Sequence, residues 1–252
     1  MSKILFLFDV DGTLTESGSI ITDSMKNKLK VLINNDNVHL GIVGGGKLDK
    51  ILYQMGDHLY FRHYFTECGC VYNKNEEYPL NIKLSQVYCK DIRKHKLYPY
   101  INILIKKTLK YLSEVEYTIT GNFIDLRSGI IYISLIGMSA NNDERKYFME
   151  LDKIHKYRIQ LLELLMKEAN ELNILSDIDI VEGGSVGIAI YPKEYDKVQV
   201  LEYLMNDYHE IHYFGDKYLE NGNDYHIIHN KNVIGHQVNN PEDTMNIIET
   251  LI

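Results

Sequence analysis

Two carboxylates stand two residues apart where an apolar run of the chain ends. Residues 4–8 are all apolar, and the chain continues as Asp9-Val10-Asp11-Gly12-Thr13. Five apolar residues without alternation are typical of a parallel strand that is covered on both faces. Open α/β sheets bind their ligands beyond the carboxyl ends of such strands. We therefore expect Asp9 and Asp11 at a binding site, on the same side of an extended chain.

Two carboxylates at this spacing predict phosphoryl transfer. Asp9 could attack phosphorus and carry an aspartyl-phosphate, which divides one difficult displacement into two easier ones. Asp11 could pass a proton to and from an alcohol or sugar oxygen. A magnesium ion between the carboxylates and the phosphate would offset their repulsion. A calcium loop of the EF-hand kind is disfavoured, because Gly12 comes two residues too early.

The same edge of the sheet should receive a third carboxylate. A D-x-D-G-T sequence after a buried strand resembles motif I of the haloacid dehalogenase (HAD) superfamily of phosphotransferases. A second apolar run, residues 211–214, ends at Gly215-Asp216. We expect Asp216 to be the second metal ligand, with Asp224 beside it as a further metal ligand or as an orienting group.

A glycine turn is the candidate phosphate site. Gly44, Gly45 and Gly46 follow a predicted strand at 38–43 and precede a predicted helix at 48–55. A turn of this kind presents free backbone N–H groups to an anion, so Gly45 and Gly46 are candidate substrate-binding residues. The alternative is a tight turn without a ligand, because the sequence is neither G-x-G-x-x-G nor a Walker A loop.

The periodicity of the chain predicts a core interrupted by an insertion. Strands alternate with helices in residues 1–81 and 191–252, which is typical of a doubly wound parallel α/β sheet. From about residue 82 the pattern predicts a helix at 98–112 and a hairpin at 123–134. A helix capped by Asn141 and Glu144, another from after Asp152 to about 172, and strands at 178–182 and 186–191 follow. We expect an α+β cap domain with an antiparallel sheet at 82–190.

Composition excludes several classes of partner. A net charge of −8 argues against nucleic acid, which requires a clustered basic surface. The three cysteines have neither zinc nor C-x-x-C spacing, which fits a reducing compartment. There is no amino-terminal signal and no apolar run near the roughly 20 residues that span a bilayer. The sequence predicts a cytoplasmic protein without a membrane partner.

The whole chain, beyond its first motif, is similar to the eukaryotic phosphomannomutases. The similarity runs from near residue 4 to near residue 250, through both predicted domains. The shared phrases include Leu7 to Thr15, Val43-Gly44-Gly45, Arg127-x-Gly129, Glu144-Arg145, Glu150 to Lys153, Asp196-Lys197, Phe214 to Lys217, Gly222-Asn223-Asp224 and Pro241 to Thr244.

The resemblance implies an activity and its cofactors. It implies interconversion of mannose 6-phosphate and mannose 1-phosphate, which supplies GDP-mannose, through a hexose 1,6-bisphosphate that also serves as activator. Asp9 would be the nucleophile and Asp11 the acid and base, with Mg²⁺ on Asp9, Asp11 and Asp216. The resemblance also implies a homodimer formed through the cap.

Three cationic residues gain roles from the resemblance. Lys197, at the start of the helix before strand 211–214, would neutralise charge at the aspartyl-phosphate; by position alone it could be an ordinary exposed lysine. Arg127 and Arg145 would bind the distal phosphate of the substrate.

Five positions depart from the family pattern. Glycine or an apolar residue replaces an arginine or a hydroxyl- or carboxylate-bearing residue at Gly18, Gly46, Met138, Gly187 and Ala189. A hydrogen bond to a charged group contributes roughly 1.5 to 3 kcal/mol, so each loss could weaken binding by about tenfold to a hundredfold. A phosphatase, or a mutase acting on another sugar phosphate, is therefore the alternative. A non-catalytic binding protein is disfavoured, because clustered carboxylates cost stability.

Overall fold

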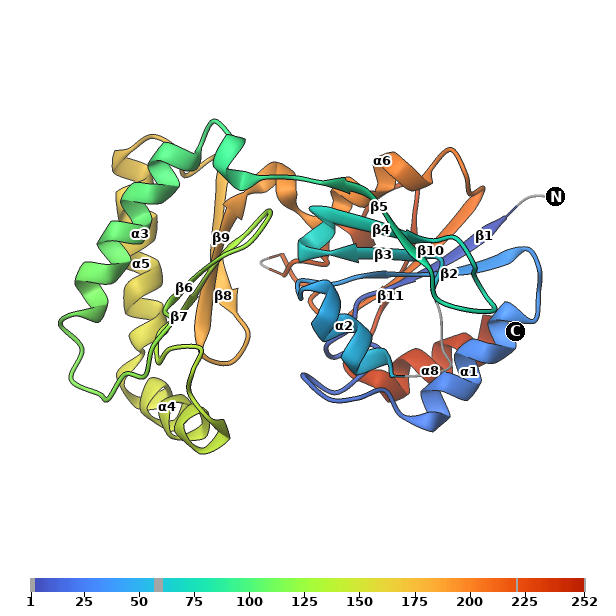
Figure 1. The fold of residues 1–252 in the computed structure, drawn as a ribbon, viewed down its shortest axis with the longest axis horizontal. Helices are drawn as coiled ribbons and strands as arrows, with labels where there is room; N and C mark the ends of the chain where they lie inside the picture. Colours follow the sequence, from blue (N-terminus) through green and yellow to red (C-terminus); the bar gives the residue numbers. More distant parts are fainter. Residues whose placement is uncertain (1–2, 57–60, 221, 252) are drawn as a thin grey trace. The chain divides into compact units, whose positions relative to one another are not determined.

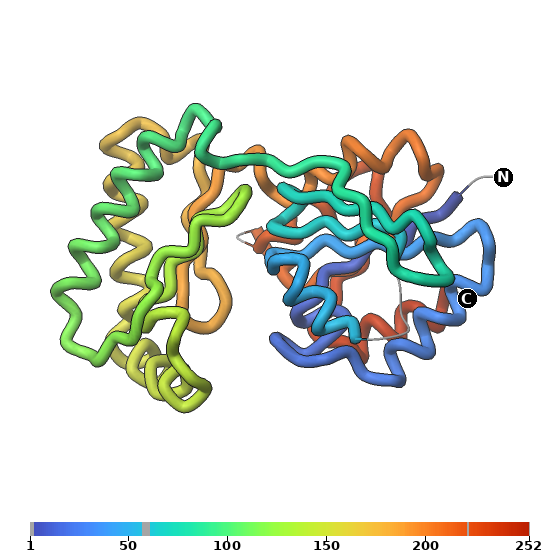
Figure 2. The backbone as a smooth tube through the Cα atoms, viewed as in Figure 1, coloured from blue at the N-terminus to red at the C-terminus, as the bar shows by residue number. Residues whose placement is uncertain are grey.

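The chain forms two compact units. A computed structural model describes residues 3–56, 61–220 and 222–251. The first, here the core unit, comprises Met1–Lys90 and Tyr195–Ile252, and the second, here the insert unit, comprises Asp91–Glu194. The core unit is built from the blue-to-teal and orange-to-red segments of Figure 2. The predicted insertion was 82–190; the insert unit begins at Asp91, because residues 84–89 pair with the core sheet, and it ends at Glu194.

A seven-stranded sheet organises the core unit. Its order is β11-β10-β1-β2-β3-β4-β5, and all neighbours are parallel except β4 and β5, which continue the sheet antiparallel. The strands are β1 (Ile4–Phe8), β2 (Val38–Val43), β3 (His63–Thr66), β4 (Val71–Asn75), β5 (Leu84–Cys89), β10 (Glu210–Gly215) and β11 (Ile234–Gln237). Phe8 pairs with both Phe214 and Ile42, so the carboxyl ends of β1, β10 and β2 lie side by side. The expected doubly wound α/β class is confirmed.

Helices cover both faces of this sheet (Figure 1). Phe6 and Phe8 of β1 pack on one face with α1 (Asp23–Ile33), α2 (Leu48–Met55) and α8 (Pro241–Leu251). Leu5 and Leu7 pack on the other face with η4 (Lys197–Val200), α6 (Leu201–Leu204) and α7 (Tyr225–Ile228). The strand alternates because successive side chains point to opposite faces. Burial on both faces explains why β1 reads as an unbroken apolar run.

The insert unit is a four-stranded antiparallel sheet with helices. Its order is β6-β7-β9-β8, from β6 (Ile124–Leu126), β7 (Ile131–Ser134), β8 (Ile178–Gly183) and β9 (Gly187–Pro192). The helices are α3 (Tyr98–Leu112), α4 (Asn142–His155) and α5 (Tyr157–Glu171); α5 packs on β8 and β9, and α3 packs on α5 (Figure 1). The remaining short turns are η1 (Glu67–Gly69), η2 (Ile92–Lys94) and η3 (Lys193–Tyr195).

Most of the helices and strands of the insert unit agree with those predicted from local sequence signals. The capping box of Asn141 and Glu144 is formed at the start of α4, and the 123–134 hairpin is present. The prediction of a helix beginning after Asp152 is wrong, since Asp152 lies inside α4. The break falls at Lys156, whose left-handed φ of 59° separates α4 from α5. Among the described residues, each helix is too short or too polar to span a bilayer.

Candidate active site

Three carboxylates converge beyond the carboxyl ends of β1 and β10. One oxygen from each of Asp9, Asp216 and Asp224 lies within 4.8 Å of the others. Gly12 permits this approach. Its φ is +87°, and a Cβ at this position would lie 2.5 Å from Asp216 Oδ2. The D-x-D-G-T sequence therefore needs glycine both for its backbone conformation and to leave room for Asp216.

A buried lysine neutralises part of this negative charge. Lys197 has no exposed surface, and its Nζ donates to Asp9 Oδ1 at 2.6 Å and to Asp224 Oδ1 at 2.7 Å. Asp196 positions it by capping η4, accepting a hydrogen bond from the Lys197 N–H at 2.5 Å. The structure thus places Lys197 with the carboxylates rather than on the surface.

The pKa values of this group are mutually dependent. Burial raises the pKa of Asp9 above its ordinary value, and Lys197 opposes that rise. Burial acts to lower the pKa of Lys197, but Asp224 and Asp9 raise it well above its ordinary value. A cation in the low-dielectric interior is retained when carboxylates surround it. Lys197 therefore stays charged throughout the physiological pH range.

Asp224 has the contacts of an orienting group. Its Oδ1 accepts from Lys197 and from the Tyr213 hydroxyl, and its Oδ2 accepts from the Lys217 N–H at 2.9 Å. Both oxygens are thus already in use. Of the two roles predicted for Asp224, the geometry favours orientation of Lys197 over direct metal binding.

Unsatisfied oxygens in the same region suit a hard cation. Asp216 Oδ2 accepts from Lys217 Nζ at 2.5 Å, whereas Asp216 Oδ1 is buried without a hydrogen-bond partner among the described residues. Asn223 Oδ1 is in the same condition, in the loop that carries Asp224. Magnesium takes oxygen ligands and prefers carboxylates. The residues present fit Mg²⁺, and Asn223 is a candidate that the sequence analysis missed although it adjoins Asp224.

The structure separates the Asp11 side chain from the other carboxylates. Because β1 ends at Phe8, the chain turns before Asp11 instead of continuing extended. Asp11 Oδ1 accepts from the Gly18 N–H at 2.7 Å and from Gln54 Nε2 at 2.8 Å, and Oδ2 accepts from Lys50 Nζ at 2.6 Å. Partial burial acts to raise the pKa of Asp11, but these three donors lower it overall. The expected convergence of Asp9 and Asp11 side chains on one cation is not present.

Lys50 and Gln54 were not predicted as site residues. They lie four residues apart on α2, so both reach Asp11 from one face of that helix. Their signal in the sequence was the spacing alone, one and two turns after the glycine turn. The turn itself, residues 44–46, leads into α2, whose N-cap Lys47 makes no side-chain cap. A Cβ at Gly46 would lie 3.2 Å from Lys50 Cδ, so Gly46 leaves space for the Lys50 stem.

The predicted arginines lie in the insert unit and are held by local contacts. Arg127 Nε donates to Asp125 Oδ2 at 2.7 Å, and its guanidinium lies 5.0 Å from the centroid of the Tyr132 ring. Arg145 donates to the carbonyls of Ala140 and Met138, at 3.0 and 3.2 Å. Both side chains are therefore oriented within their own unit.

Tyr132 fills space beside one of the altered positions. A Cβ at Gly187 would lie 2.3 Å from the Ile133 carbonyl oxygen and 2.6 Å from the Tyr132 ring. The Tyr132 hydroxyl donates to the Gly183 carbonyl at 3.1 Å. A side chain at 187 would therefore collide with Tyr132, a contact that the sequence does not reveal.

Comparison with solved structures agrees with this architecture. The chain resembles Plasmodium falciparum IMP-nucleotidase with a TM-score of 0.68 and 16% identity, over 99% of this chain and 62% of that one. It resembles the C-terminal domain of C. albicans trehalose-6-phosphate phosphatase with a TM-score of 0.61 and 16% identity, over 100% and 94%. At this level of identity, the two similarities show a shared α/β fold.

Comparison with related sequences identifies the family of the chain. A family model of eukaryotic phosphomannomutase matches residues 25–252, which begins after D-x-D-G-T. A phosphomannomutase from Spinacia oleracea is 37% identical over 96% of this chain and 93% of its own length. A probable phosphomannomutase from Caenorhabditis elegans is 34% identical over 100% and 96%. The chain belongs to the eukaryotic phosphomannomutase family.

Proposed function

We propose that this chain is a magnesium-dependent phosphomannomutase that interconverts mannose 1-phosphate and mannose 6-phosphate and thereby supplies GDP-mannose synthesis. The observation that carries the proposal is the placement of Asp9. It lies at the end of β1, is buried, and is held by Lys197 through one oxygen only. Its Oδ2 has no hydrogen-bond partner among the described residues and is free to act as nucleophile.

The reaction then runs in two transfers. The 6-hydroxyl of mannose 1-phosphate attacks the phosphoryl group on Asp9, the bond to the aspartyl oxygen breaks, and Asp11 takes the hydroxyl proton. The product is a hexose 1,6-bisphosphate. After this intermediate turns around, Asp9 attacks the phosphorus at position 1. Asp11 returns its proton to the departing sugar oxygen, which releases mannose 6-phosphate and restores the phosphoenzyme.

The surrounding residues support these steps. The hydrogen bonds that lower the pKa of Asp11 favour the carboxylate that must first accept a proton. Lys197 holds Asp9 in place and offsets charge as the phosphoryl group arrives. Mg²⁺, held by Asp9 and Asp216 with Asn223 as a further donor, would neutralise phosphate charge. Gly45 and Gly46 would bind phosphoryl oxygens through backbone N–H groups at the start of α2.

The proposal also covers the role of the insert unit, the oligomeric state, the activator and the cellular location. Arg127 and Arg145 would bind the distal phosphate, so that the insert unit acts as a substrate-recognising cap and as the surface of a homodimer. A hexose 1,6-bisphosphate would prime Asp9. A cytoplasmic location suits the three free cysteines, of which Cys68 and Cys70 are buried.

A second candidate rests on the altered substrate shell. Gly18 has open space where a side chain would stand, and Tyr132 occupies the space beside Gly187. A shell with fewer charged donors would hold the bisphosphate less firmly and release it before it turns around. The same Asp9 chemistry would then serve a phosphatase, or a mutase that acts on another sugar phosphate.

Trapping the phosphoenzyme tests the proposal. Intact-mass spectrometry after brief incubation with glucose 1,6-bisphosphate and Mg²⁺ should detect one added phosphoryl group on the wild-type protein. Asp9→Asn should add none, whereas Asp36→Asn, an exposed control, should match the wild type. A phosphorylated Asp9→Asn protein with native circular dichroism would overturn the assignment of the nucleophile.

A further inference from the structure

A basic cavity lies at the edge of the core sheet opposite Asp9. It has a volume of about 640 Å³, and its cationic lining residues are Lys3, Arg62 and Lys74. Lys3 precedes β1, Arg62 precedes β3, and Lys74 lies across from the first residue of β3 in the antiparallel β4. All three therefore gather at the amino ends of the parallel strands. Asp9 follows the other end of β1, roughly 17 Å away for a five-residue strand at 3.3 Å per residue.

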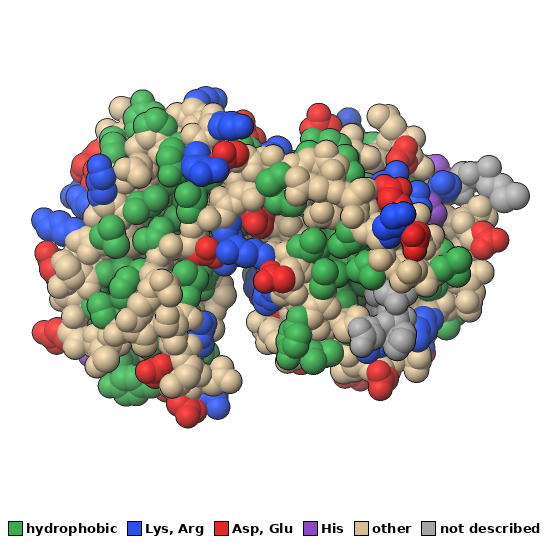
Figure 3. Space-filling model, viewed as in Figure 1, with side chains coloured by type: hydrophobic (Ala, Val, Ile, Leu, Met, Phe, Trp, Pro, Cys, Tyr) green, Lys and Arg blue, Asp and Glu red, His purple; other side chains and the backbone are tan. Residues whose placement is uncertain are grey.

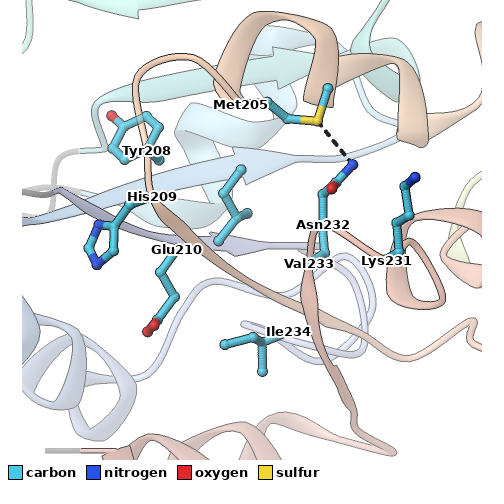
Figure 4. A pocket seen from close by; sticks show the side chains of 9 residues that line it. Met205, Tyr208, His209, Glu210, Lys231, Asn232, Val233 and Ile234 are labelled. Atoms are coloured by element: carbon cyan, nitrogen blue, oxygen red, sulfur yellow. Dashed lines mark hydrogen bonds between the residues drawn. The ribbon is translucent and has the colours of Figure 1, made fainter.

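The cavity shares lining residues with a neighbouring one. The second cavity, of about 390 Å³, shares Met205, Tyr208 and His209 with the first and adds Lys231 (Figure 4). Figure 3 shows basic, acidic and histidine side chains gathered near the start of β1. The two cavities thus lie next to each other at the amino edge of the sheet.

The cations that line the first cavity outnumber its carboxylates. The only carboxylate lining the first cavity among the described residues is Asp207, and within that part of the chain no carboxylate makes an ion pair with Lys3, Arg62 or Lys74. Burial lowers the pKa of His39 to about 4, and the charges of Arg62 and Lys3 act in the same direction. Three cations without partners are unusual on a chain whose net charge is −8.

A buried histidine and two tyrosines organise the floor of the cavity. His63 is 2% exposed; its Nδ1 lies 2.7 Å from the Tyr72 hydroxyl and its Nε2 lies 2.6 Å from the Tyr208 hydroxyl. The Tyr208 hydroxyl also lies 2.7 Å from His39 Nδ1. A phenol has one proton, so it can donate to only one of these two imidazoles, and the other must donate to it.

Two arrangements of the protons are possible, and in one of them His39 has an N–H group that Tyr208 does not use. If His63 Nε2–H donates to Tyr208, then Tyr208 donates to His39 Nδ1, and His39 carries its proton on Nε2. His39 Nε2 has no partner within the described part of the chain. An acceptor in the cavity would select this arrangement, because it would satisfy the Nε2–H group.

We propose that the first cavity is a second anion site, separate from the catalytic one, that binds a small soluble phosphate: inorganic phosphate or a phosphate monoester. Arg62 and Lys74 supply charge-assisted hydrogen bonds, Lys3 adds a third cation, and His39 donates through Nε2. A phosphate carries close to two negative charges at pH 7, which suits three cations and one carboxylate.

The test follows the imidazole signals of His39 and His63 by NMR while inorganic phosphate is added at constant ionic strength. We expect a saturable shift of both signals, and a similar response to glucose 6-phosphate. Arg62→Gln combined with Lys74→Gln should weaken binding about tenfold or more, as loss of charged hydrogen bonds predicts. Lys30→Gln combined with Lys106→Gln removes the same charge from exposed positions and should leave binding unchanged.

The readout separates this site from the catalytic one, since His39 and His63 lie at the other edge of the sheet. The single change Lys74→Gln, on the surface of β4, gives the same comparison if the double variant folds poorly. Shifts that sodium chloride reproduces, or equal phosphate affinity in the Arg62 and Lys74 variants, would overturn the proposal.

Discussion

Lys197 is a fully buried cation whose charge is balanced by Asp9 and Asp224. Lys197→Met should leave two buried carboxylates without their cation. Removing one partner of a buried pair typically costs about 3–5 kcal/mol, so we expect a loss of that size in the free energy of unfolding at pH 7. Urea denaturation in EDTA measures it, with the exposed Lys30→Met as control.

The stability loss caused by Lys197→Met should also depend on pH. Without Lys197, burial raises the pKa of Asp9 further, so the folded variant binds a proton more tightly than the unfolded chain. Its stability relative to the wild type should therefore recover as pH falls from 7 to 5. A difference below about 1 kcal/mol at pH 7 would contradict a buried ion pair.

Lys50 is the residue whose charge most directly controls Asp11. Its Nζ lies 2.6 Å from Asp11 Oδ2 and helps to lower the pKa of that carboxyl. Lys50→Met should raise the pKa of Asp11, because a stabilising cation is lost. If Asp11 first accepts a proton, the acid limb of the kcat profile moves to higher pH. Tyr53→Ala, an exposed change on the same helix, should leave the limb in place; a limb unmoved by Lys50→Met would contradict the role of Asp11.

Substitutions at two glycines of the loop after β1 should distinguish the effect of backbone strain from that of side-chain crowding. Gly12 and Gly18 both have positive φ, +87° and +74°, but only Gly12 faces a side chain, Asp216. Alanine in this conformation costs roughly 1–2 kcal/mol at either position. Gly12→Ala should in addition displace Asp216 and raise the Mg²⁺ concentration needed for half-maximal activity, whereas Gly18→Ala should not. Equal magnesium requirements in the two variants would argue against Asp216 as a ligand.

The β7–β9 pairing in the insert unit accounts for Gly187. A side chain there meets the Ile133 carbonyl and the Tyr132 ring. Gly187→Ser should therefore destabilise the protein by about 1–3 kcal/mol through overpacking. Gly121→Ser is the matched control, because its nearest neighbour would be 3.8 Å away. Thermal unfolding compares them, and an undiminished melting temperature of Gly187→Ser would refute the crowding argument.

Elements with strong local signals could be predicted from the sequence. The ends of β1 and β10, the Thr22 cap of α1 and the capping box of α4 all depend on neighbouring residues. The antiparallel edge formed by β4 and β5 could not be predicted, because its pairing joins segments whose own patterns do not specify a partner. The break between α4 and α5 at the left-handed Lys156 could not be predicted either, because lysine has no preference for that conformation.

The candidate site was predictable to the same extent. Asp9 and Asp216 could be placed because strand ends in a parallel sheet meet at one edge. Lys197 could be placed only through the family resemblance, because by position alone it could be an exposed lysine. The direction of the Asp11 carboxylate could not, because it depends on the turn after Phe8. Lys50, Gln54, Asn223 and Tyr132 reach their positions through tertiary packing, which a single sequence does not encode by spacing.

In the whole molecule, the residues proposed for phosphoryl transfer belong to the core unit, and the candidate arginines belong to the insert unit. The core unit retains Asp9, Asp11 and Lys197, whereas several expected donors of the insert unit are replaced. The central claim is that the altered shell still returns the bisphosphate to the core in its second orientation.

Phosphorus NMR tests that claim most directly. The wild-type protein is incubated with Mg²⁺, mannose 1-phosphate and a trace of glucose 1,6-bisphosphate, with Asp9→Asn as the inactive control. We expect growth of a mannose 6-phosphate signal without accumulation of inorganic phosphate. Growth of inorganic phosphate alone, or no reaction of mannose 1-phosphate in the wild type, would contradict it.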